Sequence, residues 1–351
     1  MGYPDFEKLM ARVVTFGEIM MRLSPPLYTR FTDAKGFEMN YGGGAANVAV
    51  SLAKFGINTA HITKLPKNDF GEACVNELRG RGVGTSAIVR GGERMGIYYA
   101  EKGAAQRPGR VIYDRKNSSI NEISVSELDF DKIFDGAEWF HFTGISPALS
   151  QNVLDVLIAV LKETKRRGIT VSCDLNYRKK LWTNERAGEV MSNLMQYVTV
   201  LISNEEDCES VFGLYASDSD INSGGISVDG YKSLALLLMK AFPSIKSTAF
   251  TLRRSYTASW NGWGGLFVDA DGEYQSRYYD ISVIVDRMGG GDAFAAGLIY
   301  GLLSGNGGQY AVEFAAAASC LKHTVQGDFN NVTAMEVETL ISGGGSGRVV
   351  R

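Results

Sequence analysis

Short apolar runs alternate with longer amphipathic stretches along most of this chain. Runs of five to eight apolar or β-branched residues fit buried strands, and apolar positions repeating every three or four residues fit helices. Strands are predicted at 12–16, 59–64, 139–143, 170–174, 198–202, 248–252, 258–268 and 282–285. Helices are predicted at 48–55, 69–81, 152–167, 185–195, 234–241, 293–303 and 311–323, with a short helix opening at Asn204. Such alternation indicates an α/β fold whose mainly parallel sheet is covered by helices on both faces.

The rhythm of strand and helix is interrupted at residues 94–119. There, Ile97-Tyr-Tyr99 and Val111-Ile-Tyr113 form two strand-like groups separated by a loop that contains Gly and Pro, which predicts a hairpin flap. The sequence predicts one domain over residues 1–340, with lid segments at about 18–40 and 94–119. Residues 215–230, rich in Ser, Asp and Gly, fit a surface insertion, and 341–351 fit a flexible tail.

The stretch Asp286-Arg-Met-Gly-Gly-Gly-Asp292 leads directly into an Ala-rich helix. Gly289, Gly290 and Gly291 can point their N–H groups at one anion where that helix begins, and the helix dipole adds to the attraction. Asp292, in the first turn, is then placed to take a proton from an attacking hydroxyl. The stretch therefore fits a phosphoryl-transfer centre, although a tight turn with an acidic helix cap would look the same. The Walker ending Gly-Lys-Ser/Thr is absent.

The flap carries an excess of positive charge. Its basic residues are Arg94, Lys102, Arg107, Arg110, Arg115 and Lys116, and its acidic residues are Glu101 and Asp114. Guanidinium groups near Tyr98 and Tyr113 suit the capture of a carboxylate with hydroxyl contacts alongside. A solvated hairpin with charged edges is the alternative.

Composition narrows the class of partner. The formal net charge is −3, with 36 Lys and Arg against 39 Asp and Glu interspersed, which argues against nucleic-acid or membrane-surface binding and favours a small-molecule partner. The four Cys and three His are scattered without metal-ligand or disulfide spacing. The chain start lacks a signal pattern, and no apolar stretch is long enough to cross a bilayer, so a cytoplasmic protein is expected.

Two glycine-rich motifs, Gly42-Gly-Gly-Ala-Ala-Asn47 and Asp286-Arg-Met-Gly-Gly-Gly-Asp292, resemble the two signatures of the ribokinase-like (PfkB) sugar kinases. The resemblance implies a three-layer α/β fold with a small β-sheet lid over the sugar, the use of ATP with Mg²⁺, and a homodimer or higher homo-oligomer. It also implies that Asp292 is the catalytic base, that Gly289, Gly290 and Gly291 form the anion hole, and that Asn47 contacts the substrate.

A narrower resemblance is to the 2-keto-3-deoxygluconate kinases of that family, through Gly17-Glu-Ile-Met-Met-Arg-Leu-Ser-Pro-Pro26, Lys102-Gly-Ala-Ala-Gln-Arg107, Val111-Ile-Tyr-Asp-Arg115, Asp174-Leu-Asn-Tyr-Arg178 and Gly327-Asp328. It implies that a sugar acid contacts a set of substrate-binding residues, namely Gly43, Tyr98, Tyr113, Arg115, Arg178 and Asp328. Taken from the residues alone, Arg178 also fits an ordinary salt bridge, and the tyrosines also fit plain sheet positions.

The nucleotide side departs from the usual family pattern. Asn204-Glu-Glu-Asp207 resembles the Asn-x-x-Glu motif for magnesium and phosphate, which makes Asn204 a cofactor contact and Asp207 a magnesium contact through water. An N-cap with an acidic first turn is the alternative. In Leu252-Arg253-Arg-Ser255-Tyr-Thr-Ala258, which resembles the nucleotide loop, Ser255 and Ala258 replace glycines. Arg253, Ser255 and Ala258 are the expected nucleotide contacts.

These observations lead to one expected function and two alternatives. The chain is expected to transfer the γ-phosphoryl group of ATP to a hydroxyl of a sugar acid, 2-keto-3-deoxygluconate, with Asp292 as the base. The alternatives are a kinase for a neutral sugar such as fructose or ribose, and a sugar-binding regulator with little turnover.

Overall fold

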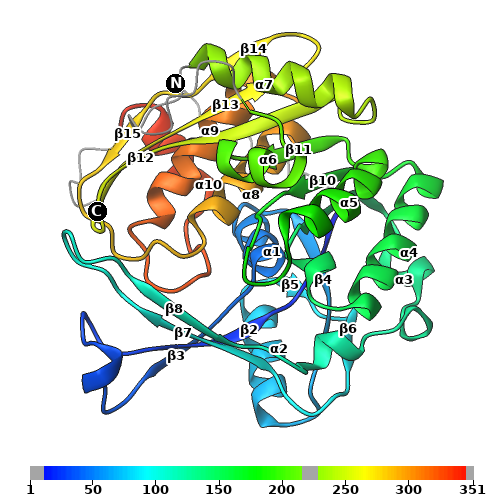
Figure 1. Cartoon of the computed structure of the whole chain (residues 1–351), viewed down its shortest axis with the longest axis vertical. Coiled ribbons are helices and arrows are strands. Elements are labelled where there is room, and N and C mark those ends of the chain that lie inside the picture. The colour runs from blue at the N-terminus through cyan, green and yellow to red at the C-terminus, as the bar shows by residue number, and fades with distance from the viewer. Residues whose placement is uncertain (1–11, 216–227, 345–351) are drawn as a thin grey trace.

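The computed structural model describes residues 12–215 and 228–344, which form a three-layer α/β body and a smaller sheet that projects from it (Figure 1). The body is built on a sheet with the strand order β14-β13-β12-β11-β10-β9-β1-β4-β5, parallel from β12 to β5, with β13 and β14 antiparallel at one edge. Two short strands, β15 and β6, pair with β13 and β4 respectively. The predicted parallel α/β fold is confirmed.

The elements have the following bounds. Strands of the large sheet are β1 (Arg12–Phe16), β4 (Asn58–Leu65), β5 (Val83–Gly84), β6 (Ile88–Arg90), β9 (Ala137–Thr143), β10 (Thr170–Asp174), β11 (Val200–Ser203), β12 (Ser247–Thr257), β13 (Trp260–Val268), β14 (Glu273–Gln275) and β15 (Tyr279–Ile281). The α-helices are α1 (Gly44–Lys54), α2 (Asp69–Gly80), α3 (Phe130–Ile133), α4 (Gln151–Arg167), α5 (Asn184–Leu194), α6 (Glu205–Phe212), α7 (Val228–Ala241), α8 (Gly290–Leu303), α9 (Gly307–Lys322) and α10 (Ala334–Ile341). Short 3-10 helices lie at Phe31–Asp33, Ser119–Glu122, Val125–Glu127, Ser146–Ala148 and Met195–Tyr197.

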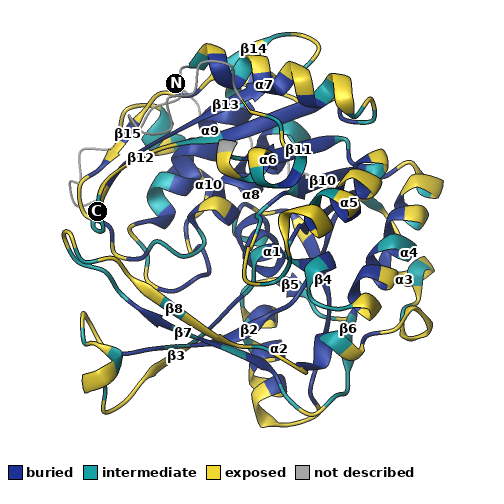
Figure 2. Cartoon of the chain, in the orientation of Figure 1, coloured by how far each residue is buried: buried dark blue, intermediate teal, exposed yellow. Residues whose placement is uncertain are grey.

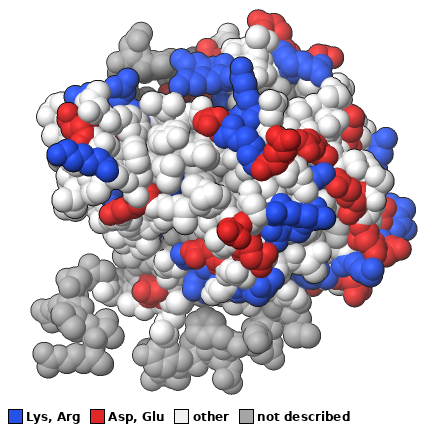
Figure 3. All heavy atoms as spheres, turned by 90° about the horizontal axis from the view of Figure 1, so that it is seen from below, with Lys and Arg blue, Asp and Glu red and all other residues white. Residues whose placement is uncertain are grey.

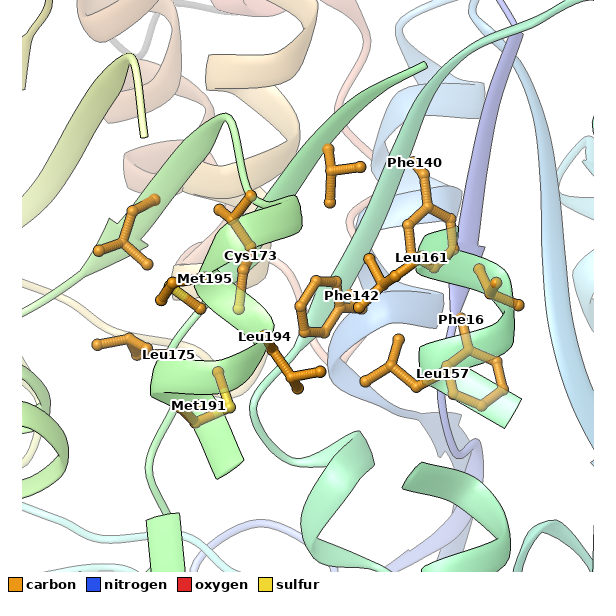
Figure 4. Close-up of a cluster of buried hydrophobic side chains, with 14 of the residues drawn as sticks. Phe16, Phe140, Phe142, Leu157, Leu161, Cys173, Leu175, Met191, Leu194 and Met195 are labelled. Carbon is orange, nitrogen blue, oxygen red and sulfur yellow. The ribbon is translucent and has the colours of Figure 1, made fainter. Parts of the chain in front are cut away.

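Alternate residues of the central strands divide the interior into two cores. In β1 and β9, Phe16, Phe140 and Phe142 pack with α4 and α5 in one core, which Figure 4 shows. The side chains of Val13 and Trp139 lie on the opposite face of these strands and belong to the other core, with α1, α8 and α9. Successive side chains of a strand point to opposite faces of the sheet. A strand with apolar residues at both odd and even positions therefore needs helices on both faces to bury them.

The smaller sheet is the lid, with the strand order β3-β2-β7-β8. Its strands are β2 (Met20–Ser24), β3 (Glu38–Gly42), β7 (Gly96–Glu101) and β8 (Arg110–Asp114), so both predicted lid segments contribute to it. The predicted hairpin is the antiparallel pair β7 and β8, and β2 runs parallel to β7. In Figure 1 the lid extends away from the body below the level of α8 and α10.

Several predicted elements differ from the structure. Residues 282–285 are not a strand: the N–H of Ile284 donates to Ser259 O and that of Val285 to His323 O, a turn and a helix end, so no ladder forms. Val283 is consequently 71% exposed. Helix α10 was not predicted, and β12 extends to Thr257, beyond the predicted end at residue 252. Of the predicted insertion and tail, 216–227 and 345–351 lie outside the described residues, and 228–230 open α7.

The surface is mixed in character. Figure 2 shows the central strands and the inner faces of the helices as buried, with exposed residues on the outer helix faces and the lid edges. On the face drawn in Figure 3, acidic and basic side chains lie among one another. Within 12–215 and 228–344, no helix has both the length and the apolar character needed to cross a membrane.

Candidate active site

A cavity of about 1680 Å³ lies among the lid, the carboxyl ends of β10 and β11, the β12–β13 hairpin and the start of α8. The carboxyl edge of a parallel sheet is where α/β proteins usually bind ligands. The cavity brings together most of the predicted site residues: Tyr113, Arg115, Arg178, Asn204, Asp207, Arg253, Ser255, Gly289, Gly290, Gly291 and Asp292. Its volume exceeds that of a pocket for one small ligand, so it can hold two.

The glycine turn forms the start of α8. Gly289 is the N-cap in the left-handed region, with φ of 81°, and its carbonyl accepts the N–H of Ala293 at 2.8 Å. A Cβ at Gly289 would lie 2.2 Å from the carbonyl oxygen of Asp328, so only glycine fits here. Gly291 has open space on its cavity side. The first N–H groups of a helix have no partner within the helix, and Gly289, Gly290 and Gly291 line the cavity, so this turn can serve as an anion site.

The second glycine of the turn makes room for a histidine. A Cβ on Gly290 would lie 2.6 Å from the His323 ring, whose Nδ1 is paired with Ser319 O at 2.7 Å. His323 also packs against Trp263, with ring centroids 5.0 Å apart. The absence of a side chain at Gly290 therefore makes room for the histidine beneath it.

Asp292 is buried at the wall of the cavity and held by one partner. Asn47 Nδ2 donates to Asp292 Oδ2 at 2.6 Å, and Asn47 Oδ1 accepts the N–H of Gly43 at 3.2 Å. Burial raises the pKa of Asp292 to about 6, and the Asn47 hydrogen bond opposes that rise. Oδ1 accepts no side-chain hydrogen bond from the described residues, so it is open to a substrate proton.

Two further carboxylates lie at the strand ends nearby. Asp174 ends β10, and burial, followed by the charges of Asp292 and Asp207, raises its pKa to about 8. Burial also raises the pKa of Asp207, which pairs with Asn204 in the first turn of α6, to about 6. Asn204 Oδ1 accepts the N–H of Asp207 at 2.8 Å, so the residue is an N-cap as well as a cavity residue. Among the described residues, no cluster of three or more His, Cys, Asp or Glu could enclose a metal ion.

The two arginines expected at the sugar differ in their surroundings. Arg115 Nε donates to Oε2 of the buried Glu18 at 2.8 Å, and Nη2 donates to the same oxygen. Its Nη1 has no hydrogen-bond partner in the described part of the chain. Arg178 is exposed, and its Nη1 donates only to the neighbouring carbonyl of Tyr177, at 3.3 Å. Both guanidinium groups therefore retain donors for a ligand.

Four other expected substrate residues lie behind the cavity wall. Tyr98 donates its hydroxyl hydrogen to Asp328 Oδ2, while Arg22 forms ion pairs of 2.9 Å with both Asp286 and Asp328. Gly43 packs on the backbone of Glu18, where a Cβ would lie 2.0 Å from the carbonyl oxygen. Asn47, the fourth, contacts Asp292, as described above. Their polar groups contact other protein groups, and they affect the cavity by positioning the residues that line it, such as Asp292.

The nucleotide side of the cavity is formed by the β12–β13 hairpin. Arg253 and Ser255 line it, whereas Ala258 does not: its N–H donates to Ala105 O of the lid loop at 2.7 Å. Arg287 donates to the carbonyl oxygens of Thr257 and Ala258. Arg287 and Ala258 are thus in direct contact.

Sequence reasoning missed residues that act through partners far along the chain. Glu18, which orients Arg115, lies 97 positions away from it, and no sequence pattern marks that pairing. Asp174 could have been found, since it ends a predicted parallel strand at the same sheet edge as Arg178.

A buried carboxylate beside the N–H groups of a helix start, in a three-layer body with a four-stranded lid, defines a phosphotransferase with a ribokinase-like fold. The model of the "pfkB family carbohydrate kinase" matches residues 10–222 and 263–334. The chain therefore belongs to the pfkB family of carbohydrate kinases and is an ATP-dependent phosphotransferase.

Individual relatives cover nearly the whole chain. The crystal structure of a 2-dehydro-3-deoxygluconokinase from Thermotoga maritima is 46% identical, with a TM-score of 0.91, over 95% of this chain and 98% of that one. A 2-dehydro-3-deoxygalactonokinase from Haloferax volcanii is 32% identical, over 97% of this chain and 99% of the relative. A 2-dehydro-3-deoxygluconokinase from Bacillus subtilis is 26% identical, over 92% and 93%.

Proposed function

We propose that this protein phosphorylates a 2-keto-3-deoxy sugar acid, 2-keto-3-deoxygluconate, with ATP and Mg²⁺. The observation that carries the proposal is the convergence of Arg115, from the lid, and Arg178, from the end of β10, on the cavity that contains Asp292. A carboxylate held between two guanidinium groups gains charge-assisted hydrogen bonds that a neutral sugar cannot form.

In this proposal each oxygen of Asp292 has a separate task. Oδ2 accepts the Asn47 hydrogen bond, which fixes the carboxylate, and Oδ1 takes the proton of the attacking hydroxyl. The N–H groups of the glycine turn stabilise the negative charge that develops on the transferred phosphoryl group. The lid excludes water, which would otherwise compete with the sugar as acceptor.

The residues present fit ATP and magnesium. The glycine turn and Arg253 supply donors for phosphate oxygens, and Ser255 lines the same side of the cavity. Asp207 and Asp174, whose pKa values burial raises, can take hydrogen bonds from metal-bound water. Magnesium would neutralise phosphate charge, and it usually keeps several waters, so a site without a dedicated protein cage suits it.

The relatives support a sugar acid and leave two configurations to compare. The Thermotoga maritima and Bacillus subtilis relatives are named for the gluconate and the Haloferax volcanii relative for the galactonate, and the last is 32% identical against 26% for the Bacillus subtilis protein. We propose the gluconate because the 46% identical structure carries that name.

The test is a coupled assay of ADP release with 2-keto-3-deoxygluconate, 2-keto-3-deoxygalactonate, fructose and ribose as acceptors. The proposal predicts the highest kcat/KM with 2-keto-3-deoxygluconate and at least a tenfold lower value with either neutral sugar. A higher kcat/KM with fructose or ribose would overturn the sugar-acid assignment, and a higher value with the galactonate would overturn only the configuration.

A further inference from the structure

Lys322 is a fully buried lysine at the end of α9, directly behind the glycine turn. Its Cε lies 3.2 Å from the position that a Cβ on Gly289 would take. Its ammonium donates to Val325 O at 3.2 Å, and no ion pair among the described residues includes it. Burying an ammonium group is expensive, so its position needs an explanation.

The buried position of Lys322 is explained only in part by its balancing of the negative charge on Asp286 and Asp328. Arg22 already forms the direct contacts with Asp286 and Asp328, at 2.9 Å each. Two carboxylates against one guanidinium leave one negative charge, which Lys322 offsets without touching either acid within 4.0 Å. The electric field of the Lys322 ammonium group therefore also acts on the glycine turn and on Asp292.

Lys322 is electrostatically connected to the proposed base. Its positive charge opposes the rise that burial causes in the pKa of Asp292. Burial lowers the pKa of Lys322 itself, and the charges of Asp286 and Asp328 favour its protonated form. The ionisable groups that act on Asp292 are Lys322 from α9, Arg178 and Asp174 from the end of β10, and Asp328 from the segment after α9.

We propose that Lys322 is an internal cation that supports catalysis from behind the anion hole. It keeps the carboxylate of Asp292 ionised, and it adds positive potential to the helix start that receives the transferred phosphoryl group. It touches neither the sugar nor the phosphates, so it is a positioning residue that acts through the glycine turn and Asp292. The inference rests on the proposed role of Asp292.

The first test is Lys322→Met, which replaces the side chain by an unbranched apolar one that is one atom shorter and removes its charge. The expected result is a kcat lower by about ten- to a hundredfold, with the KM for the sugar changed by less than about threefold. The acid limb of the pH profile is the fall of kcat/KM toward low pH as the base becomes protonated. Because the positive charge lowers the pKa of Asp292, loss of that charge should also move the acid limb to higher pH. The assay uses whichever acceptor the wild type turns over best, so it is independent of the identity of the sugar.

The matched control is Arg22→Met, which removes the other cation of the same cluster. Arg22 has direct partners, so its loss should lower the thermal midpoint more than Lys322→Met does, and it should move the acid limb less. Should Lys322→Met fail to fold, Lys322→Arg keeps the charge and is predicted to retain the wild-type acid limb. An Arg variant with a displaced limb would contradict the proposal.

Amine rescue separates charge from shape. In Lys322→Ala, methylammonium chloride should restore kcat by at least about threefold, while tetramethylammonium chloride at the same ionic strength, being too large for the space, should not. The proposal is overturned if Lys322→Met keeps its kcat within about threefold and loses only thermal stability. It is also overturned if kcat falls while the acid limb stays in place and methylammonium has no effect. Absence of turnover in the wild type would instead count against the proposed function.

Discussion

At the scale of single residues, most of the site is built from charged groups that hold one another in place. Asn47 fixes Asp292, Glu18 fixes Arg115, and Arg22 joins two acids at the base of the lid. A group that is held in position before the substrate arrives does not need to reorganise during the reaction. The residues that remain free, above all Arg178 and Oδ1 of Asp292, are the ones we expect to contact the substrate.

The role of Asp292 is tested by Asp292→Asn, which keeps the shape and cannot take a proton. We expect kcat to fall by ~10²–10⁴-fold. The Asn47 contact lies on one oxygen only, so sugar binding by calorimetry and the thermal midpoint should stay near wild type. A variant that retains more than about a tenth of the wild-type kcat would remove Asp292 from the role of base.

The pH dependence follows from the same residue. Burial raises the pKa of Asp292 to about 6, and the base works only when it is ionised, so kcat/KM should rise with pH through about 6 and then level off. Rates are measured from pH 5 to 8 at saturating magnesium, because Asp174 and Asp207 also titrate in this range. A profile that is flat from pH 5 to 7 would show that no such base limits the reaction.

The two arginines should be separable by their surroundings. Arg115→Ala and Arg178→Ala should each lower kcat/KM for the sugar acid by about ten- to a hundredfold, and leave the weak turnover of fructose nearly unchanged, since a charge-assisted hydrogen bond is lost. Only Arg115→Ala should also lower the thermal midpoint, because the buried Glu18 carboxylate then loses its ion pair and keeps only the hydrogen bond from Ser118. Arg186→Ala, which breaks a surface ion pair on α5, is the control. Equal losses with the acid and with fructose would assign the arginines to lid shape or phosphate binding.

The sequence predicted features that lie within one short stretch and missed those that depend on contacts between residues far apart along the chain. The glycine turn and Asp292 lie in one short stretch, so local chemistry was enough to identify them. Arg115 and Arg178 were predicted as sugar-acid contacts, but Glu18 was not, because its pairing with Arg115 depends on a contact between the β1–β2 connection and the end of β8. The strand predicted at 282–285 was wrong for a similar reason, since its N–H groups bond to a turn and a helix end.

At the scale of elements, the β12–β13 hairpin connects the lid to the anion site. Its turn is held on one side by Ala105 of the lid loop and on the other by Arg287, just before the glycine turn. Ala105 has φ of 47°, so the lid loop adopts a left-handed conformation, uncommon outside glycine, at the point of contact. The two hairpin residues that replace glycines of the family pattern therefore have different surroundings. Ala258 contacts the lid loop, and Ser255 lines the cavity.

This difference leads to a prediction for the hairpin. Ser255→Gly should lower the KM for ATP, because the backbone at the cavity could approach the nucleotide more closely, whereas Ala258→Gly should change it by less than about twofold. Initial rates at a saturating concentration of sugar acid measure both values. If Ser255→Gly leaves ATP binding unchanged while Ala258→Gly improves it, the hairpin contacts the nucleotide through its turn and our assignment of the wall is incorrect.

At the scale of the whole molecule, the lid sheet has two faces of different character. The register places Asn40, Arg22, Tyr98 and Tyr113 in one row across the sheet, and Arg22 and Tyr98 of this row are buried toward Asp286 and Asp328. The next row, formed by Met39, Leu23, Tyr99 and Ile112, is mainly apolar and lies on the opposite face because side chains alternate along each strand. Leu23 packs against a hydrophobic core cluster of the body, and the two ends of the row are exposed. Met39 is 47% and Ile112 is 50% exposed.

An apolar row on the outer face of a sheet is the kind of surface that a second copy of the chain covers. We therefore predict a homodimer that pairs through the outer faces of two lids, measured as the molar mass by light scattering after gel filtration. Ile112→Lys places a charge at the β8 end of this row, on the edge strand of the lid, and should give a monomer. The control is Leu236→Lys, at a residue of α7 that is 56% exposed and distant in sequence from the lid, which should keep the wild-type mass. A wild type that is already monomeric at micromolar concentration, or an Ile112→Lys variant that stays dimeric, would show that the lid is not the interface.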